Sequence, residues 1–320
     1  MFYIDQSNPG FTNAINEHYV NVRYVIKKKL LGHSFKEPHP KGLNYRINQV
    51  YGIQSSLFRF LNDEINLREL LIGLPNTLDK LKSRFTNKKD IKSIKSLVRY
   101  DSFSEKDKDK NGAFRFYNCF HLAENLGQST CIYCNRLYTT TVITAAREFI
   151  ARPTFDHWFP KSRYPLLALS FYNLIPSCSV CNMTIKGSDV YSINDVFHPY
   201  FKHSDPTQQL NFRFSYDLED HKVAKPKLIY GNAFSQRSIT TMQLEEMYKV
   251  HKEEIRELIY LKKAYSSAYL ESLEKILKTK LSDSEVYRLA FGVYSEEEQH
   301  FRRPLSKMKK DILTELGILK

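Results

Sequence analysis

Apolar side chains recur at helical spacing through the first hundred residues of the chain. Ile15, Tyr19, Val22 and Ile26 are three or four positions apart, which places them on one face of a helix that Gly32 can end. A second apolar series of this kind runs through residues 48–73. We therefore expect residues 1 to about 103 to be mainly helical.

The segment 87–100 combines an apolar stripe with a basic one. Its apolar side chains fall on one helical face: Ile91, Ile94 and Val98. Its basic side chains recur at steps of four, three and four residues on another face: Lys88, Lys92, Lys95 and Arg99. Such a helix packs inward through one face and can present charge to a phosphate backbone. A solvated surface, or a face that docks a partner protein, is the alternative for this basic stripe.

The pattern changes after this segment. Alternating charges and the Asn111–Gly112 pair in residues 102–116 predict an exposed linker or turn. Residues 210–218 and 225–232 read as two short strands around a polar turn. From about residue 240 the apolar spacing is helical again, and Pro304 and Gly317 can open and close a last helix.

These patterns predict an α+β fold that is mostly helical. We expect an N-terminal helical domain at 1–110 and a central module at 111–205 that contains the cysteine-rich region. A short β-hairpin followed by a helical C-terminal domain is expected at 206–320.

Composition and charge add an expectation about the partner. The chain has 320 residues, of which 42% are hydrophobic, so it can bury a core. Its formal net charge of +13 favours a polyanionic partner, nucleic acid ahead of a membrane surface. The chain lacks an apolar run of 18 residues and starts without a secretory signal pattern, so we expect a cytoplasmic protein with no membrane partner.

Four of the five cysteines form two Cys-x-x-Cys pairs: Cys131, Cys134, Cys178 and Cys181. In a chain without a secretory signal, this spacing predicts a metal site rather than a disulfide framework. A redox site needs only one such pair, so two pairs favour a closed, structural Zn²⁺ site with four sulfur ligands. Cys119 is expected to be a buried small apolar residue.

An Asp-His pair, Asp156 and His157, and a single asparagine, Asn173, lie between the cysteine pairs, and Asn182 follows the last cysteine. This order resembles the HNH nuclease family, the ββα-metal nucleases. The family pattern has Asp-His at the end of one strand, Asn before the next strand, and His or Asn at the start of a helix. The resemblance covers residues 131–187, under a fifth of the chain. It departs from the common pattern by having Asn rather than His at the third position, as certain CRISPR effectors have.

The resemblance implies a role for each of these residues. His157 would act as the general base, because an imidazole with a pKa of about 6.5 can accept a proton from water. Asp156 and Asn182 would be the protein ligands of a catalytic Mg²⁺ or Mn²⁺, since both offer hard oxygen atoms. Asn173 would hold His157, or the loop behind it, through hydrogen bonds from its amide.

The implied activity is that of a metal-dependent endonuclease that hydrolyses phosphodiester bonds, with DNA favoured. Lys161 and Lys186 lie near the motif and are expected to contact phosphates. An RNA endonuclease, with tRNA among its substrates, is one alternative, and a non-catalytic zinc-stabilised nucleic-acid-binding module is another. Short basic HNH proteins with helical flanks also resemble nuclease subunits of anti-phage defence systems of the Septu type, which implies an ATPase partner subunit.

Overall fold

The computed structural model describes residues 1–42, 46–104, 113–146, 148–219, 223–264 and 291–318, together with residues 272, 275 and 288. The fold is α+β and mostly helical, with three two-stranded antiparallel sheets among these residues, so the predicted fold class is confirmed. The expected turn at Asn111–Gly112 lies outside the described residues. No helix in the described part of the chain is long and apolar enough to cross a membrane.

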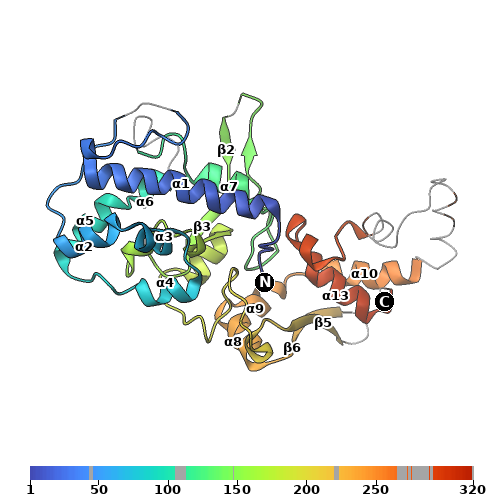
Figure 1. The fold of residues 1–320 in the computed structure, drawn as a ribbon. Helices are drawn as coiled ribbons and strands as arrows, with labels where there is room; N and C mark the ends of the chain where they lie inside the picture. The colour runs from blue at the N-terminus through green and yellow to red at the C-terminus, as the bar shows by residue number, and fades with distance from the viewer. Residues whose placement is uncertain are drawn as a thin grey trace.

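The N-terminal half is an assembly of short helices around one long helix, α1 (Figure 1). The helices are α1 (Pro9–Leu31), α2 (Ser55–Asn62), α3 (Glu64–Ile72), α4 (Pro75–Leu81), α5 (Lys88–Leu97), α6 (Tyr100–Ser104) and α7 (Cys119–Leu126), with a short 3-10 turn η1 (Gly32–Ser34). Helix α1 begins with an Asn8 cap and a proline in its first turn, and it ends at Gly32, which has a φ of 57°. The predicted stop at Gly32 is therefore confirmed.

Helix α5 carries most of the two predicted stripes, but it ends at Leu97, so Val98 and Arg99 lie beyond it, and Ile91 is only partly buried. Ile94, Leu97 and the following Val98 are buried, whereas the side chains of Lys88, Lys92, Lys95 and Arg99 are exposed. Its first turn is capped by Asn87, whose side chain accepts a hydrogen bond from the backbone of Asp90. Helix α5 packs against α1 and against the 3-10 turn η2 (Pro165–Leu167) of the central module.

The central module contains two paired strands followed by a short helix. Strand β3 (Thr154–His157) runs antiparallel to β4 (Leu174–Ser177), with His157 opposite Leu174. The chain between them forms η2 and η3 (Phe171–Asn173), and β4 leads to η4 (Val180–Lys186). Element η4 is a π-helix, in which the backbone of Gly187 bonds back five residues to Asn182 at 2.9 Å.

Helices of the N-terminal half pack directly on this module. Helices α1, α3 and α4 contact η3, and α5 contacts η2, so the first two predicted domains share an interface. A hairpin of β1 (Val142–Ile143) and β2 (Phe149–Ala151) lies within the module, before β3, and projects from the body of the protein (Figure 1).

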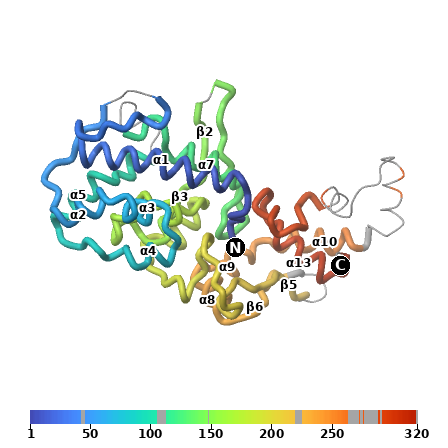
Figure 2. Tube along the Cα trace, in the orientation of Figure 1, coloured from blue at the N-terminus to red at the C-terminus, as the bar shows by residue number. Residues whose placement is uncertain are grey.

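The C-terminal half is a long hairpin covered by helices. Strands β5 (Phe212–Glu219) and β6 (Val223–Tyr230) pair along their whole length, which confirms the two predicted strands. The remaining elements are η5 (Pro206–Gln208), α8 (Ala233–Thr241), α9 (Leu244–Tyr248), α10 (Lys252–Ala264), η6 (Glu297–Arg302) and α13 (Ser306–Glu315). Helix α13 packs on β5 and α10 packs on β6. The chain trace places this half beside the N-terminal half, with residue 1 at the junction (Figure 2).

Aromatic side chains join α1 to the central module. The rings of Phe11 and Phe171 lie 5.5 Å apart, and both pack against Tyr200. His18 lies in the same interface, where its Nε2 donates to the carbonyl oxygen of Leu169 at 2.8 Å. Burial lowers the pKa of His18 to about 4, so the imidazole is neutral in the folded protein.

The neutral state of His18 predicts a dependence of stability on pH. Folded His18 has a pKa of about 4 and an unfolded imidazole one of about 6.5, so between these values the unfolded chain binds one more proton. The stability that this group contributes is complete above about pH 6.5 and falls by roughly 1.4 kcal/mol per unit as the pH drops toward 4. Urea unfolding across this range should give a steeper loss for the wild type than for His18→Gln. Parallel curves would contradict the prediction, because any loss of bound metal at low pH affects both proteins alike.

Candidate metal centre and active site

The four paired cysteines come together in one buried cluster. Their Sγ atoms all lie within 4.8 Å of one another, and those of Cys134 and Cys178 are 4.0 Å apart. Tetrahedral zinc with Zn–S bonds of about 2.3 Å sets sulfur atoms roughly 3.8 Å apart, so the cluster has the size of a zinc site. Among the described residues, this is the only group of three or more His, Cys, Asp or Glu side chains placed to hold a metal ion.

The backbone around the sulfur atoms favours thiolates. The amide of Arg136 points at the Sγ of Cys134, and the amide of Cys181 points at the Sγ of Cys178, each at 3.4 Å. Burial raises the pKa of Cys131 well above that of a free thiol, so a cation is needed to hold four thiolates at this distance. These residues therefore fit the predicted zinc ion.

The first cysteine pair is also fixed from the C-terminal half of the chain. Asn135, in the left-handed conformation at φ 52°, donates from its side chain to the carbonyl oxygens of His300 and Arg303. Its own carbonyl oxygen accepts from Leu305, and the hydroxyl of Tyr248 donates to the carbonyl oxygen of Cys134 at 2.6 Å. The turn that carries Cys131 and Cys134 is thus held on two sides.

Strand β3 ends at His157, whose side chain is only 7% exposed. Its Nε2 lies 3.0 Å from the carbonyl oxygen of Ala168. A carbonyl oxygen can only accept, so Nε2 carries the proton and Nδ1 carries the lone pair. Burial lowers the pKa of His157 to about 3, against a smaller opposing effect of the Ala168 carbonyl, so the ring is neutral.

Asn173 closes the loop between β3 and β4. Its Oδ1 accepts from the backbone of Phe159 at 2.7 Å, and its Nδ2 donates to the carbonyl oxygens of Phe159 and Leu167 at 3.1 and 3.0 Å. The loop held in this way includes Ala168, the hydrogen-bond acceptor of His157. The side chain of Asn173 therefore fixes the backbone that orients the imidazole.

Asp156 precedes the histidine and is 1% exposed. Its Oδ2 accepts from the hydroxyl of Tyr133 at 2.7 Å, and its Oδ1 lies 3.4 Å from the Nζ of Lys186. Burial raises the pKa of Asp156, although the charge of Lys186 opposes that shift.

Asn182 lies in η4 and is half-exposed. A carboxylate and an amide oxygen, completed by water, suit Mg²⁺ or Mn²⁺, so the donor types fit the predicted divalent ion.

Lys186 does not occupy the position that the sequence predicts. It was expected at a phosphate, but its side chain is buried, with its Nζ donating to the carbonyl oxygen of His157 at 2.9 Å. It lies beside Asp156 and above the ring of Tyr191. The expectation assumed α-helical spacing after Asn182, whereas the wider π-turn of η4 rotates position 186 toward the core.

Two tyrosines contact the site residues, and the sequence pattern predicts neither of them. Tyr133 bonds to Asp156, and the ring of Tyr100 lies edge-on to the ring of His157, with centroids 4.4 Å apart. The position of Tyr133 between two metal-binding cysteines was the one available signal. Lys161 lies at the rim, where its Nζ is 4.6 Å from the centre of the Tyr100 ring and 3.0 Å from Asp101.

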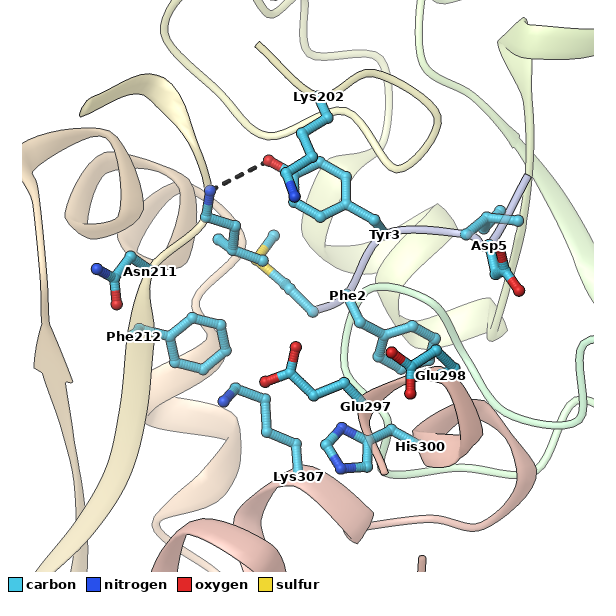
Figure 3. A pocket seen from close by; sticks show the side chains of 13 residues that line it. Phe2, Tyr3, Asp5, Lys202, Asn211, Phe212, Glu297, Glu298, His300 and Lys307 are labelled. Atoms are coloured by element: carbon cyan, nitrogen blue, oxygen red, sulfur yellow. Dashed lines mark hydrogen bonds between the residues drawn. The ribbon is translucent and has the colours of Figure 1, made fainter. Parts of the chain in front are cut away.

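A separate cavity of about 410 Å³ lies between the N-terminal segment, the start of β5, η6 and α13. Figure 3 shows Phe212, Glu297, His300 and Lys307 around it. Acidic and basic side chains are mixed in its lining, and Lys307 is already paired with Asp311 at 3.0 Å. None of the described residues predicted to act in catalysis or metal binding lines this cavity, so we place the candidate chemistry at β3.

Comparison with known proteins adds no relative. No family model, curated protein or solved structure matches the chain. The functional inference therefore rests on the residues and geometry of the site.

The cysteine cluster predicts one zinc ion per chain. Cys131→Ser and Cys178→Ser should each lose that zinc and lower the melting temperature, because a structural zinc contributes on the order of 10 kcal/mol to folding in small modules and less in larger ones. Metal analysis and thermal unfolding measure both effects. Cys119→Ser is the matched control, since Cys119 is equally buried but lies outside the cluster. A wild-type protein without zinc, or cluster variants that keep it, would contradict this prediction.

Proposed function

We propose that the protein is a metal-dependent endonuclease that hydrolyses phosphodiester bonds of nucleic acid, with DNA as the favoured substrate. The observation that carries the proposal is the order and geometry of the central module. The antiparallel strands β3 and β4 and the short helix η4 carry Asp156, His157 and Asn182. The four cysteines, which lie before β3 and after β4, meet in one cluster. A core packing role alone requires none of these three polar side chains.

Phosphodiester hydrolysis needs a proton acceptor for the attacking water and neutralisation of charge on the phosphoryl oxygens. The Nδ1 of His157 is the proton acceptor in this proposal, because Nε2 is engaged with Ala168. The Ala168 carbonyl favours the imidazolium that forms when the proton arrives, but burial has the larger effect and lowers the pKa of His157 to about 3. His157 would therefore be a weaker base than the free imidazole on which the prediction from sequence is based, and a bound divalent ion would also have to activate the water. Asp156 and Asn182 would hold Mg²⁺ or Mn²⁺, which supplies the positive charge when it is bound.

Nucleic acid is the proposed substrate because exposed basic side chains lie on α5 and in the segment that connects it to the tyrosine beside His157. Three residues of the basic stripe are exposed on α5, and Arg99 is exposed just beyond its end; within the described part of the chain none of the four forms a salt bridge. The stripe ends at Arg99, directly before Tyr100, whose ring contacts His157. Lys161 lies over the same tyrosine ring, with its Nζ 4.6 Å from the ring centre. Phosphates bound along α5 would therefore approach the proposed site.

One observation favours the non-catalytic alternative, a zinc-stabilised nucleic-acid-binding module. The ammonium group of Lys186 lies 3.4 Å from Asp156 in the core, so the protein itself supplies a positive charge beside the proposed metal ligand. In that alternative the Asp156–Lys186 pair is structural, and nucleic acid binds without being cut. The ATPase partner that the Septu resemblance implies stays a prediction.

His157→Ala should reduce cleavage by roughly 10² to 10⁴, the usual contribution of a general base, and leave binding nearly unchanged. Plasmid, single-stranded DNA and total RNA should be incubated side by side, with and without added Mg²⁺ or Mn²⁺. Omitting the added ion is preferable to a chelator, which would also remove zinc. His33→Ala, at an exposed position, is the control. Binding without cleavage by the wild type would favour the non-catalytic module, and full activity of His157→Ala would overturn the mechanism.

The basic stripe predicts how binding depends on salt. Reversing Lys92 and Lys95 to Glu should weaken binding and reduce the slope of log affinity against log salt by roughly one unit per lost phosphate contact. The measurement uses the inactive His157→Ala protein across a salt series. Reversal of Lys249 and Lys252, two exposed lysines in the C-terminal half, is the matched control. Equal slopes for both double variants would assign the stripe to solvent or to a partner protein.

A further inference from the structure

A side-chain hydrogen bond links the cysteine cluster to Asp156 of the proposed catalytic centre. Tyr133 lies between the first two cysteines of the cluster, and its side chain is 2% exposed. Its hydroxyl donates to the Oδ2 of Asp156 at 2.7 Å, across 23 residues of sequence. This is the length of a strong hydrogen bond to a carboxylate, which makes it a fixed contact rather than a chance approach.

The two oxygen atoms of Asp156 are held unequally. Oδ2 is committed to Tyr133, whereas Oδ1 lies 3.4 Å from the Nζ of Lys186, which is longer than the roughly 2.7–2.9 Å of a good charge-assisted bond. Lys186 is anchored elsewhere, on the carbonyl oxygens of His157 and Asp189 at 2.9 and 3.5 Å. Tyr133 therefore leaves Oδ1 as the oxygen that a divalent ion would take, beside the ammonium group of Lys186.

Tyr133 is in turn fixed by the cluster. Cys131 and Cys134 flank it and share one ion in the proposed zinc site. The amide of Asn135 bonds back to the carbonyl oxygen of Cys131 at 2.8 Å, and the amide of Cys131 bonds to the carbonyl oxygen of Leu137 at 3.1 Å. The tyrosine thus projects from a closed turn, and the position of its hydroxyl is set by the metal-binding loop.

We propose that Tyr133 is a positioning residue through which the zinc site orients Asp156 to bind the divalent ion. The cluster then has a role in the active site as well as in folding. This inference rests on the proposed function, because it assigns Asp156 to that ion. Residues that orient a metal ligand typically change metal affinity or activity by about 10- to 100-fold when they are replaced.

The chain offers a matched control in Tyr248. Its side chain is also 2% exposed, and its hydroxyl donates to the carbonyl oxygen of Cys134 at 2.6 Å. Tyr248→Phe therefore removes a buried hydroxyl that bonds to the same turn and leaves the hydrogen bond to Asp156 in place. A general loosening of the turn would affect both variants, whereas loss of positioning would affect Tyr133→Phe alone.

The experiment compares wild type, Tyr133→Phe and Tyr248→Phe, each loaded with zinc. Zinc content, melting temperature, Mn²⁺ affinity by titration calorimetry and the Mn²⁺ concentration for half-maximal cleavage are measured. We expect all three to retain one zinc, with Mn²⁺ binding about 10- to 100-fold weaker in Tyr133→Phe and unchanged in Tyr248→Phe. The half-maximal Mn²⁺ concentration should rise in parallel with the loss of affinity.

The outcomes separate this inference from the proposed function. If the wild type neither binds Mn²⁺ nor cleaves nucleic acid, the proposed function fails, and the inference fails with it. If the wild type does both and Tyr133→Phe has the same Mn²⁺ affinity, the positioning role alone is overturned. Loss of zinc from Tyr133→Phe, or an equal loss of Mn²⁺ affinity in Tyr248→Phe, would show that the hydroxyl serves the fold of the turn, which also overturns the proposal.

Discussion

The central module depends on the closure of four cysteine sulfur atoms around one point. Strands β3 and β4 have four residues each, and η4 has seven, so none of these elements is long enough to be stable alone. Cys131 and Cys134 lie before β3, and Cys178 and Cys181 lie after β4. A metal ion at the cluster would therefore join the segments before β3 and after β4 and hold the strand pair and the helix as one unit.

The site also contains a buried pair of opposite charges, Asp156 and Lys186. Asp156 and Lys186 are both about 1% exposed, and removing two charges from water costs free energy that their mutual attraction repays only with good hydrogen bonding. Here the carboxylate has the Tyr133 hydroxyl, and the ammonium has the carbonyl oxygens of His157 and Asp189. An apolar pair would give similar packing at a lower desolvation cost. This buried pair of charges marks this part of the core as a candidate functional site.

Residue spacing in the sequence predicts those features that depend on local backbone geometry, such as helices, hairpins and metal-ligand pairs. The helical run that stops at Gly32, the β5–β6 hairpin and the cysteine cluster follow from periodicity and ligand spacing. The positions of Lys186 and Tyr133 do not, because they depend on the π-turn of η4 and on the packing of the metal-binding turn against β3. Tyr100 reaches His157 only because α5 packs on the central module. Such contacts arise from tertiary structure and leave no period in the sequence.

Backbone carbonyl groups accept hydrogen bonds from several side chains of the site and fix their orientation. Ala168 orients His157, and the carbonyl oxygens of His157 and Asp189 anchor Lys186, while the Asn173 amide closes the loop through Phe159 and Leu167. Carbonyl dipoles do not titrate, so the orientation of the imidazole is independent of pH as long as the loop stays closed. The C-terminal half extends this support to the metal-binding turn through Asn135 and Tyr248. Among the described residues, the module is therefore held both by helices of the N-terminal half and by contacts from the C-terminal half.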